Sequence, residues 1–370
     1  MRFSEFFNFW KNKAIIDIGK VITGNTPPTK NSSYYGDSFN WAGPSDLGMS
    51  KYINDTKVKL SNDGMLVSRV IPKNSILVTC IGSTIGKMGI STKAMATNQQ
   101  INSIIVNTKF NFEFIYYEIL YSFKKYLKTV EVQAVPIISK SAFEKLKIYV
   151  PSIDEQRKLA KFLTLIDQRI DTQSKIIEKY KSLINTIRTN VFSSFQGKWT
   201  KLCDLVENKS LQLNRGNIIP KHPKDDVYKY PVYSSSVQKD GLMGYSDYYM
   251  FDKELITWSI DGGGDIFFRE KHKFCVTNVC GILQLDTNKF SYRFVAEALK
   301  YQHSKMTFDY QTKAHPSVIE KLYSLPDIEL NEQNKYSKLF EVLYFKLRNE
   351  QKYLEIIKEQ KKYLLSNMFI

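Results

Sequence analysis

One stretch of the sequence, CIGSTIGKMG at 80–89, has residue types that could bind a phosphate. A phosphate-binding loop of nucleotide hydrolases needs a glycine, four residues and then Gly-Lys-Ser/Thr, because backbone N–H groups hold the phosphates and the hydroxyl binds Mg²⁺. Here only three residues separate Gly82 from Gly86, and Met88 follows Lys87 where the hydroxyl should stand. We therefore predict a tight turn between two strands rather than a nucleotide site.

Two further stretches contain parts of catalytic motifs. The sequence PDIEL at 326–330 places carboxylates as a metal-dependent nuclease does, but Leu330 stands where the lysine is needed. An adenine methyltransferase needs Asn or Asp before Pro-Pro and an aromatic residue after it. The one Pro-Pro pair of this chain lies between Thr26 and Thr29. We expect no catalysis in this chain, and any chemistry is expected to come from partner chains.

The cysteines favour neither a metal site nor a disulfide framework. His272, Cys275 and Cys280 lie close together in the sequence, but a fourth ligand is missing. We therefore interpret the two cysteines as buried thiols and predict no metal. Four cysteines in 370 residues are too few for a disulfide scaffold. A reducing compartment is therefore the expected setting.

The charge balance indicates a polyanionic partner. Lys and Arg number 53 against 37 acidic residues, which gives a net charge of +16. This favours nucleic acid over a membrane, with a merely basic soluble protein as the alternative. No apolar run approaches the roughly 18 residues that a membrane span needs. The opening MRFSEFFNFWK lacks the pattern of a signal peptide, so we expect a cytoplasmic protein.

Two related segments must position whatever this chain binds. PSIDEQRKLAKFLTLIDQRID begins at Pro151 and IELNEQNKYSKLFEVLYFKLR at Ile328, and their Glu-Gln pairs lie 177 residues apart. In both segments apolar residues recur at alternating steps of three and four, which predicts the seam of a coiled coil. The seam residues are Leu159, Leu163, Ile166, Ile170, Ile177 and Tyr180 in the first copy, and Phe340, Leu343, Leu347, Leu354 and Ile357 in the second.

A helix of about 36–40 residues with one apolar stripe must bury that stripe. The other copy is the economical partner, so we predict that the two helices pair antiparallel within the chain. Gln173 and its copy Glu350 interrupt both seams and are expected to form a polar layer that fixes the register. The repeat fails at one layer, where Lys361 is the copy of Ile184.

The blocks before the two helices also match each other, though faintly. Thr97-Asn98 recurs as Thr277-Asn278, 180 residues later. Both blocks predict short strands and short helices, and therefore an α+β fold. We expect strands at 75–80, 101–107, 255–259 and 281–285, and helices at 113–124 and 292–301. The predicted organisation is a globule at 1–150, a long helix at 151–197, a second globule at 198–327 and a second long helix at 328–370.

This layout resembles the specificity (S, HsdS) subunits of type I restriction–modification enzymes. The stretches that carry the resemblance cover nearly the whole chain. They are MRFSEFFNFWKNKAIIDIG and TGNTPPTKNSSYYGDSFNWAGPSDL in the first globule, YPVYSSS, ITWSIDGGG and FCVTNVCG in the second, and PSIDEQRKLAKFLTLID with its copy in the helices. The family often has Gln before the proline of the last loop, where this chain has Val135 and His315.

The resemblance implies a non-catalytic, sequence-specific DNA-binding subunit. Two α/β target recognition domains in pseudo-two-fold arrangement would each read one half of a bipartite, asymmetric double-stranded target. The long helices would dock two modification (methyltransferase) subunits, with restriction (motor-nuclease) subunits as optional further partners. No cofactor is expected in this chain, because S-adenosylmethionine, ATP and magnesium belong to the partner subunits of a type I adenine methyltransferase complex.

Basic and polar loop residues are the candidates for contact with DNA, with Gln to adenine and Arg to guanine as the expected base pairings. The candidate phosphate contacts are Lys30, Lys51, Lys87 and Lys140 in the first globule, and Arg215, Lys221, Lys239, Arg269, Lys271 and Lys313 in the second. The candidate base contacts are Thr26, Ser45, Ser83, Thr84, Gln99, Gln100 and Gln133, and then Ser234, Ser235, Gln238, Asp261, Asn278 and His315.

Partner subunits are expected on the outer faces of the helices. The residues expected there are Arg157, Lys161 and Arg169 and their copies Asn334, Lys338 and Lys346. The alternative function is a coiled-coil scaffold that binds no DNA, or an orphan specificity subunit that binds other protein partners. Co-purification with a methyltransferase chain, together with sequence-dependent DNA methylation, would separate these functions.

Overall fold

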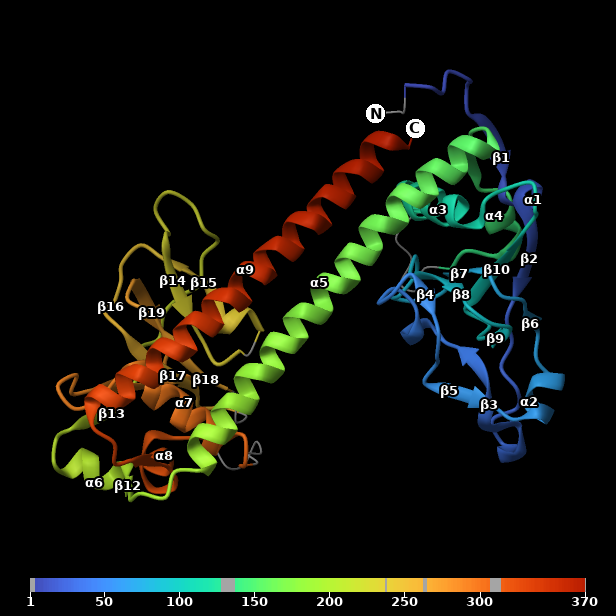
Figure 1. Ribbon diagram of the computed structural model, residues 1–370. Coiled ribbons are helices and arrows are strands. Elements are labelled where there is room, and N and C mark those ends of the chain that lie inside the picture. The colour runs from blue at the N-terminus through green and yellow to red at the C-terminus, as the bar shows by residue number, and fades with distance from the viewer. Residues whose placement is uncertain (1–3, 128–136, 237, 262–264, 307–313, 370) are drawn as a thin grey trace. The chain divides into compact units, whose positions relative to one another are not determined.

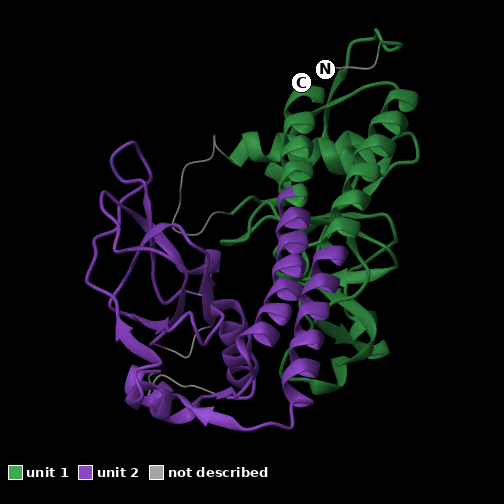
Figure 2. Ribbon diagram, turned by 60° about the vertical axis from the view of Figure 1, so that its left-hand side comes forward, with its two compact units in different colours: residues 1–174, 353–370 green, residues 175–352 purple. Residues whose placement is uncertain are grey.

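The computed structural model describes residues 4–127, 137–236, 238–261, 265–306 and 314–369. These residues form two compact units, one of residues 1–174 with 353–370 and the other of residues 175–352 (Figure 2). Each unit holds one globule together with part of both long helices, and both units contain helices and strands (Figure 1). The α+β fold is therefore confirmed for both halves of the chain.

In unit 1 a short ribbon joins the two ends of the globule, because β1 (Lys11–Ala14) pairs antiparallel with β11 (Lys147–Val150). Two sheets lie between them in the sequence. The first has the order β2 (Gly19–Thr23), β10 (Ile101–Val106), β7 (Ile76–Thr79), β8 (Met88–Ser91) and β4 (Tyr52–Ile53). The second has the order β5 (Val58–Leu60), β3 (Tyr35–Ala42), β9 (Met95–Thr97) and β6 (Val70–Ile71).

Unit 2 repeats this topology. The ribbon is formed by β12 (Trp199–Lys201) and β21 (Ser324–Pro326). The first sheet has the order β13 (Leu211–Arg215), β20 (Cys280–Leu285), β17 (Leu255–Ser259) and β18 (Ile266–Arg269). The second has the order β15 (Leu242–Ser246), β14 (Tyr230–Tyr233), β19 (Lys273–Val276) and β16 (Phe251–Asp252). In both units the only parallel pair of the second sheet among the described residues is the equivalent one, β3 with β9 and β14 with β19.

Helices occupy equivalent places as well. The largest in each globule are α3 (Phe112–Leu127) and α7 (Tyr292–His303), which bury a continuous run of side chains against the first sheet and the long helices. The smaller helices are α1 (Ile15–Ile18), η1 (Ser32–Tyr34), η2 (Pro44–Asp46), α2 (Asn62–Leu66) and α4 (Lys140–Glu144) in unit 1, and α6 (Leu202–Glu207), η3 (Gln238–Gly241) and α8 (Pro316–Leu322) in unit 2.

The predicted strands and helices of both globules are found within a few residues of their expected ends. The strand β7 reads ILVT and is buried along its whole length, as is β17, which reads LITWS. Apolar and β-branched runs of this length are typical of strands covered on both faces. Each globule therefore has one large hydrophobic core and a smaller apolar cluster beside it.

The two long helices are α5 (Ile153–Ser193), with 41 residues, and α9 (Leu330–Met368), with 39 residues (Figure 1). In unit 1 the first part of α5 meets the last part of α9, where Asp167 forms an ion pair with Lys361. In unit 2 the last part of α5 meets the first part of α9, where Arg188 donates to the Tyr344 hydroxyl at 3.0 Å. Both pairings are antiparallel, as the repeat predicts.

The predicted seam residues are buried or half-buried. This includes the polar positions, since Gln173 is buried and Glu350 is half-buried. The fully buried members are Leu159, Leu163, Ile177, Phe340, Leu343, Leu347 and Ile357, and the half-buried ones are Ile166, Ile170, Tyr180 and Leu354. The coiled-coil prediction is confirmed in each unit, while the role of the polar layer in fixing register stays a prediction.

The glutamines of the repeated Glu-Gln pairs fasten each globule to its long helix. The Gln156 side-chain oxygen accepts from the backbone N–H of Asn111 at 2.9 Å, and its nitrogen donates to the Pro151 carbonyl at 2.9 Å. The Gln333 oxygen accepts from the N–H of Ser291 at 3.0 Å, and its nitrogen donates to the Ile328 carbonyl at 2.8 Å. We call this arrangement the glutamine clamp.

The clamp joins two helix beginnings in each unit. Asn111 directly precedes α3 and Ser291 caps α7, so each amide oxygen satisfies a backbone N–H at a helix start, where no intrahelical partner exists. Both glutamines are almost wholly buried, at 2% and 1% exposure. The glutamates differ, because Glu155 accepts from the Trp10 indole whereas Glu332 pairs with Lys335 at the surface. The repeated pair therefore has a structural explanation in its glutamine.

A second junction in each unit is a hydrogen bond between a tyrosine and a carboxylate. In unit 1 the Tyr117 hydroxyl on α3 donates to Asp167 on α5 at 2.5 Å. In unit 2 the Tyr344 hydroxyl on α9 donates to Glu297 on α7 at 3.4 Å. Tyr117 and Glu297 are equivalent positions, 180 residues apart, and Asp167 and Tyr344 are equivalent at 177. The same bond is thus made twice with donor and acceptor exchanged.

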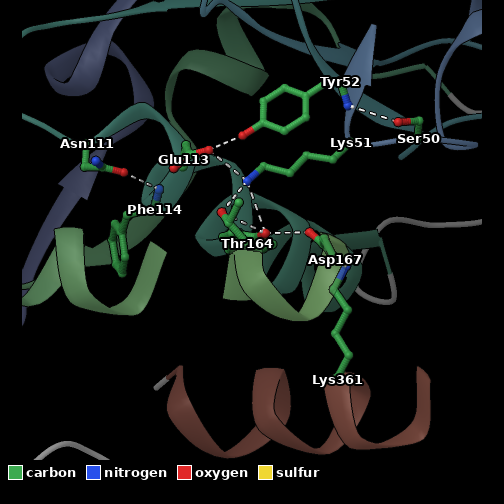
Figure 3. Close-up of polar contacts among 10 residues, drawn as sticks. Ser50, Lys51, Tyr52, Asn111, Glu113, Phe114, Thr164, Asp167 and Lys361 are labelled. Carbon is green, nitrogen blue, oxygen red and sulfur yellow. Dashed lines mark hydrogen bonds and ion pairs between the residues drawn. The ribbon is translucent and has the colours of Figure 1, made fainter. Parts of the chain in front are cut away.

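Each tyrosine–carboxylate pair carries a buried cation. In unit 1 Lys51 donates to the Tyr117 hydroxyl and to Glu113, both at 3.1 Å, and Lys361 approaches Asp167 from α9 (Figure 3). In unit 2 Arg188 donates to Glu297 at 2.8 Å. Burial alone would lower the pKa of Arg188, but the neighbouring Glu297 carboxylate raises it above its ordinary value. The Glu297 carboxylate therefore offsets the cost of burying the Arg188 charge.

The glutamine clamp predicts a local loss of stability for each glutamine separately. Gln156→Ala should destabilise unit 1 by about 1–3 kcal/mol and Gln333→Ala unit 2 by a similar amount, since each leaves a buried N–H without its acceptor. Hydrogen exchange, read separately in α3 and α7, measures the two effects. Gln168→Ala and Gln351→Ala, at exposed positions of the same helices, are the controls. Equal exchange in clamp variants and controls would show that the clamp contributes nothing.

The buried ion pair of unit 2 predicts a larger effect. Glu297→Gln should cost about 3–5 kcal/mol, because it leaves Arg188 buried without its carboxylate. The Arg188 side chain is 12% exposed and that of Glu297 is 0% exposed, so solvent cannot replace the lost charge. The measurement is hydrogen exchange in α7, with Glu341→Gln on the exposed face of α9 as the control. Wild-type exchange in Glu297→Gln would rule out the ion pair as a fastening.

Candidate nucleic-acid interface

Three polar segments of unit 1 meet at one end of its sheets. They are the segment after β2, the turn between β7 and β8, and the turn between β9 and β10. Asn25 N–H donates to the Thr97 carbonyl at 2.9 Å, and Cys80 N–H donates to the Gln100 carbonyl at 2.8 Å. Thr26 also hydrogen-bonds Gln99 through their side chains. We call this group of segments loop cluster 1.

Most of the candidate residues of the first globule lie in loop cluster 1. Gln99, Ser83 and Lys87 are exposed there, and Thr26, Thr84 and Gln100 are half-exposed. Ser45 joins them from η2, because the end of β3 accepts a hydrogen bond from Asn98 N–H at 2.9 Å, and Lys30 follows Thr26 along an exposed segment. The polar side chains therefore gather on loops that the sheets hold in place, as a binding surface requires.

The turn at 80–87 is the tight turn that the sequence predicts. Gly82 and Gly86 both adopt positive φ, at 91° and 86°, which a side chain would strain. Gly86 N–H donates to the Thr79 carbonyl at 2.9 Å and closes the hairpin between β7 and β8. The turn presents Ser83 and Lys87 at the surface rather than forming a phosphate-binding loop at a helix start.

Unit 2 forms the equivalent loop cluster 2. The Arg215 guanidinium donates to the Asn278 carbonyl at 2.8 Å, and Asn278 N–H donates to the Asn217 carbonyl at 2.9 Å. Ala314 N–H donates to the Ile260 carbonyl at 2.9 Å, which brings Asp261 beside His315, the residue that precedes α8. The predicted residues Arg215, Asp261, Asn278 and His315 are thereby gathered at one end of the globule.

A neighbouring turn adds the remaining polar candidates of the second globule. Ser234 N–H donates to the Gly241 carbonyl at 2.8 Å, so Ser234 and Ser235 lie beside the η3 turn that exposes Gln238 and Lys239. Lys221 is exposed alongside β15, where its Cβ would lie 3.0 Å from a Cβ at Gly244. Loop cluster 2 thus has the same backbone hydrogen bonds as loop cluster 1 and includes one further turn of polar residues, at η3.

A Gly-Asn pair supports both clusters and was missed in the sequence analysis. A Cβ at Gly24 would lie 2.1 Å from the Thr97 carbonyl oxygen, and a Cβ at Gly216 would lie 2.1 Å from the Val276 oxygen. Only glycine allows this approach of two backbones. The signal is visible as Gly24-Asn25 and Gly216-Asn217, but these pairs lie 192 residues apart and match neither offset of the other repeats.

Two basic candidates are buried and cannot serve as phosphate contacts. Lys51 is 7% exposed and is bonded to Glu113, Tyr117 and Thr164, and burial lowers its pKa (Figure 3). Arg269 is 5% exposed, lies 3.8 Å from the Tyr233 ring centroid and donates to the Asp240 carbonyl. Arg269 therefore supports the η3 turn from inside. Both predictions were wrong because sequence alone does not show which cations have a buried partner.

Two further basic candidates lie away from the loop clusters. Lys140 pairs with Glu144 at 3.5 Å and lines a surface hollow with Gly19 and Val106, at the opposite ends of β2 and β10 from Thr26 and Gln99. Lys271 is exposed but follows β18, at the opposite end of that strand from Asp261. Gln133 and Lys313 lie outside the described residues, so their predicted roles are untouched by the structure.

The cysteines have the expected surroundings. Cys80, Cys275 and Cys280 are free and buried, and burial raises the pKa of the Cys280 thiol to about 11. His272 hydrogen-bonds the Tyr233 hydroxyl and the Glu270 carbonyl, so its ring nitrogens are engaged. Within the part of the chain that the structure describes, no group of three or more His, Cys, Asp or Glu residues is arranged to hold a metal ion.

The outer faces of the long helices carry charged and apolar residues together. The predicted docking residues Arg157, Lys161 and Arg169, and their copies Asn334, Lys338 and Lys346, are all exposed. Leu165 on α5 is 54% exposed and its copy on α9, Val342, is 53% exposed. These apolar positions were not predicted, because the analysis of the helices followed only the seam. Their repetition is the signal that could have found them.

Comparison with known proteins places the chain in a family. A family described as "Type I restriction modification DNA specificity domain" matches residues 9–181 and 198–359, once for each globule with its helix. The chain belongs to this family. Specificity subunits of this family are in general non-catalytic and recognise a DNA target.

Two relatives illustrate the sequence similarity. The HindI specificity subunit of Haemophilus influenzae is 36% identical over 39% of this chain and 32% of its own length. The MjaIX specificity subunit of Methanocaldococcus jannaschii is 31% identical over 50% of this chain and 44% of its own length. The matched part of the chain thus spans less than half the length of these relatives.

Two solved structures share the specificity-subunit fold. A type I restriction–modification S subunit from M. genitalium has a TM-score of 0.65 at 17% identity, covering 99% of this chain and 97% of the other. A structure on complex assembly and conformational transition of the type I system has a TM-score of 0.57 at 14% identity, covering 98% of both chains.

Among the described residues, no helix has the length and apolar character to cross a membrane.

Lys87 gives a test of loop cluster 1. Lys87→Ala should weaken DNA binding on every sequence and flatten the dependence of log K on log salt by roughly one unit, because one phosphate contact is lost. Fluorescence anisotropy across salt concentrations measures the slope. Lys73→Ala is the control, since Lys73 is exposed at the opposite end of β7. Weakening restricted to one DNA sequence would contradict the assignment as a phosphate contact.

Proposed function

We propose that this chain is the target-reading subunit of a type I restriction–modification enzyme. Its two globules read the two halves of a bipartite, asymmetric double-stranded DNA target. The observation that carries the proposal is that one backbone scaffold, with Gly-Asn pairs packed on the Thr-Asn turns, is built twice and holds different polar side chains in loop clusters 1 and 2. Equivalent scaffolds with different side chains suit two half-sites of different sequence.

The side chains at the two clusters fit DNA contact. Gln99 and Gln100 in loop cluster 1 have the amide groups that pair with an adenine edge, and Asn278 in loop cluster 2 has the same kind of amide group. Lys87 and Lys239 are exposed lysines beside these groups and are suited to neighbouring phosphates. The net charge of +16 favours the approach of such a chain to DNA.

The long helices are proposed to dock two modification subunits, one against each half of the chain. The support is the repeated exposed apolar pair, Leu165 and Val342, within surfaces that also expose Arg169 and Lys346. Exposed apolar side chains with a charged rim are typical of protein interfaces. Adenine methylation would then occur in the partners, which would bind S-adenosylmethionine, and restriction subunits with ATP and magnesium would be optional. A cytoplasmic location follows from this role.

The same apolar positions also favour the second candidate, a scaffold or orphan subunit that binds only protein. The two candidates differ in whether methylation depends on the sequence of loop clusters 1 and 2. Methylated adenines mapped in cells with and without this chain decide between them. A set of methylated sites that is the same in both cells would contradict the target-reading function.

Exchange of one globule tests the reading of two half-sites. Replacing residues 1–150 with the first globule of another family member should change one half of the methylated sequence and leave the other half as before, because loop cluster 2 is untouched. Mapping of methylated adenines measures both halves at once. The matched control replaces residues 198–327 and should change the other half only. A single exchange that altered both halves would refute separate reading.

A further inference from the structure

A cleft of about 850 Å³ lies within unit 1, between the first globule and the long helices. Its walls come from the 48–51 segment, the turn before β8, α3, and the parts of α5 and α9 that belong to this unit. Seven lysines and two aspartates are among the residues that line it. We call it the lysine cleft, and its lysines are Lys51, Lys87, Lys124, Lys125, Lys358, Lys361 and Lys362.

Two of these lysines are neutralised inside the protein. Lys51 is held by Glu113 and Lys361 by Asp167, and both are buried or half-buried (Figure 3). Lys358 is exposed and pairs with Glu355 at 2.8 Å. The other four are exposed, and within the described residues Lys87, Lys124 and Lys362 make no salt bridge. The four exposed lysines outside these pairs outnumber Asp171, the lining carboxylate that is not paired with Lys361, so the wall of the cleft is positive overall.

The fold does not require this charge. The position equivalent to Lys124 is Ser304, the C-cap residue of α7, and the positions equivalent to Lys361 and Lys362 on α5 are Ile184 and Asn185. Both units pack a globule against the same helices, yet only unit 1 has lysines at these three positions. Lys125 and Lys358, in contrast, have lysine equivalents in unit 2, which are Lys305 and Lys181. Lys124 and Lys362 make no salt bridge and have no basic equivalent in unit 2, so the packing that the two units share does not require them, which favours a ligand at these two positions.

The chemistry of the wall favours phosphate. Lysine binds phosphate as a compact point charge without reading a base, and exposed lysines line this cleft. It also continues from loop cluster 1, because Gly86 and Lys87 belong to both. A strand whose bases were read at loop cluster 1 would pass its backbone along this wall.

We propose that the lysine cleft holds a segment of the phosphate backbone of the DNA that unit 1 reads. This inference rests on the proposed function, because it extends the DNA contact of loop cluster 1 along the same strand. It assigns phosphate contacts to Lys124 and Lys362, which the sequence analysis did not select. It also makes the two halves of the chain unequal, with the stronger sequence-independent contact in unit 1.

The test uses the full chain and a fluorescent duplex of random sequence, with binding followed by anisotropy from about 50 to about 200 mM salt. The variant is Lys124→Ala with Lys362→Ala. The salt slope should be flatter by about two units, because two phosphate contacts are lost. Lys124→Arg with Lys362→Arg should keep the wild-type slope. Thermal unfolding at the wild-type temperature confirms that the exposed substitutions leave the fold intact.

The matched control is Lys73→Ala with Lys93→Ala. Both lysines are exposed in unit 1, at the other end of β7 and β8, so the total charge changes equally. A wild-type slope in Lys124→Ala/Lys362→Ala, or an equal loss in the control, overturns the proposal and leaves the proposed function standing. Loss of modification-subunit binding with an unchanged slope also overturns it, because the cleft would then dock protein. A wild-type chain that binds no duplex rejects both proposals.

Discussion

The architecture depends on fastening each globule to the long helices at a fixed place. Each globule has its own hydrophobic core. Without a specific polar contact, the apolar seam of a long helix would allow the globule several orientations against it. The glutamine clamp fixes the start of the long helix to the start of α3 or α7 through one buried amide. Because the amide satisfies a backbone donor and a backbone acceptor together, any sliding of the helix would leave polar groups buried and unbonded.

The second junction shows which part of the duplication was kept. The tyrosine–carboxylate bond persists in both units, although Tyr117 and Glu297 occupy equivalent positions and carry opposite roles. The cation that pairs with the carboxylate also lies on a different helix in each unit. In unit 1 Lys361 on α9 pairs with Asp167, and in unit 2 Arg188 on α5 pairs with Glu297. The physical requirement was therefore a compensated buried charge between globule and helix. The identity of the residues that met it was free to change.

The pattern of the sequence was sufficient for the large elements. The seam spacing predicted both long helices and their antiparallel pairing, and the strand runs predicted the central strands of the first sheet in each unit. The resemblance gave the family, which the comparisons confirm. Most of the polar candidates, such as Gln99, Gln100 and Asn278, lie on loops as predicted, and the structure adds that these loops gather at one end of each globule. Their contact with DNA stays a prediction.

Sequence reasoning failed where long-range partners decide the role of a side chain. Lys51 and Arg269 are residue types that usually lie at the surface, but tertiary contacts bury them. Lys51 pairs with Glu113, and Arg269 donates to Thr257 and to the Asp240 carbonyl. Lys361 was found only as a mismatch of the repeat, since its partner Asp167 lies on another helix. The Gly-Asn pairs escaped notice because insertions between the repeats change the offset. Leu165 and Val342 escaped because one amphipathic stripe already explained the helices.

The exchanged roles at the tyrosine–carboxylate junction make the two halves of the chain incompatible with each other's helices. If the globules traded places, Glu297 would face Asp167, two carboxylates in a buried setting, and Tyr117 would face Tyr344 with no anion between them. The two globules of this chain are therefore not interchangeable, because each carries the half of the junction that its own long helices complete.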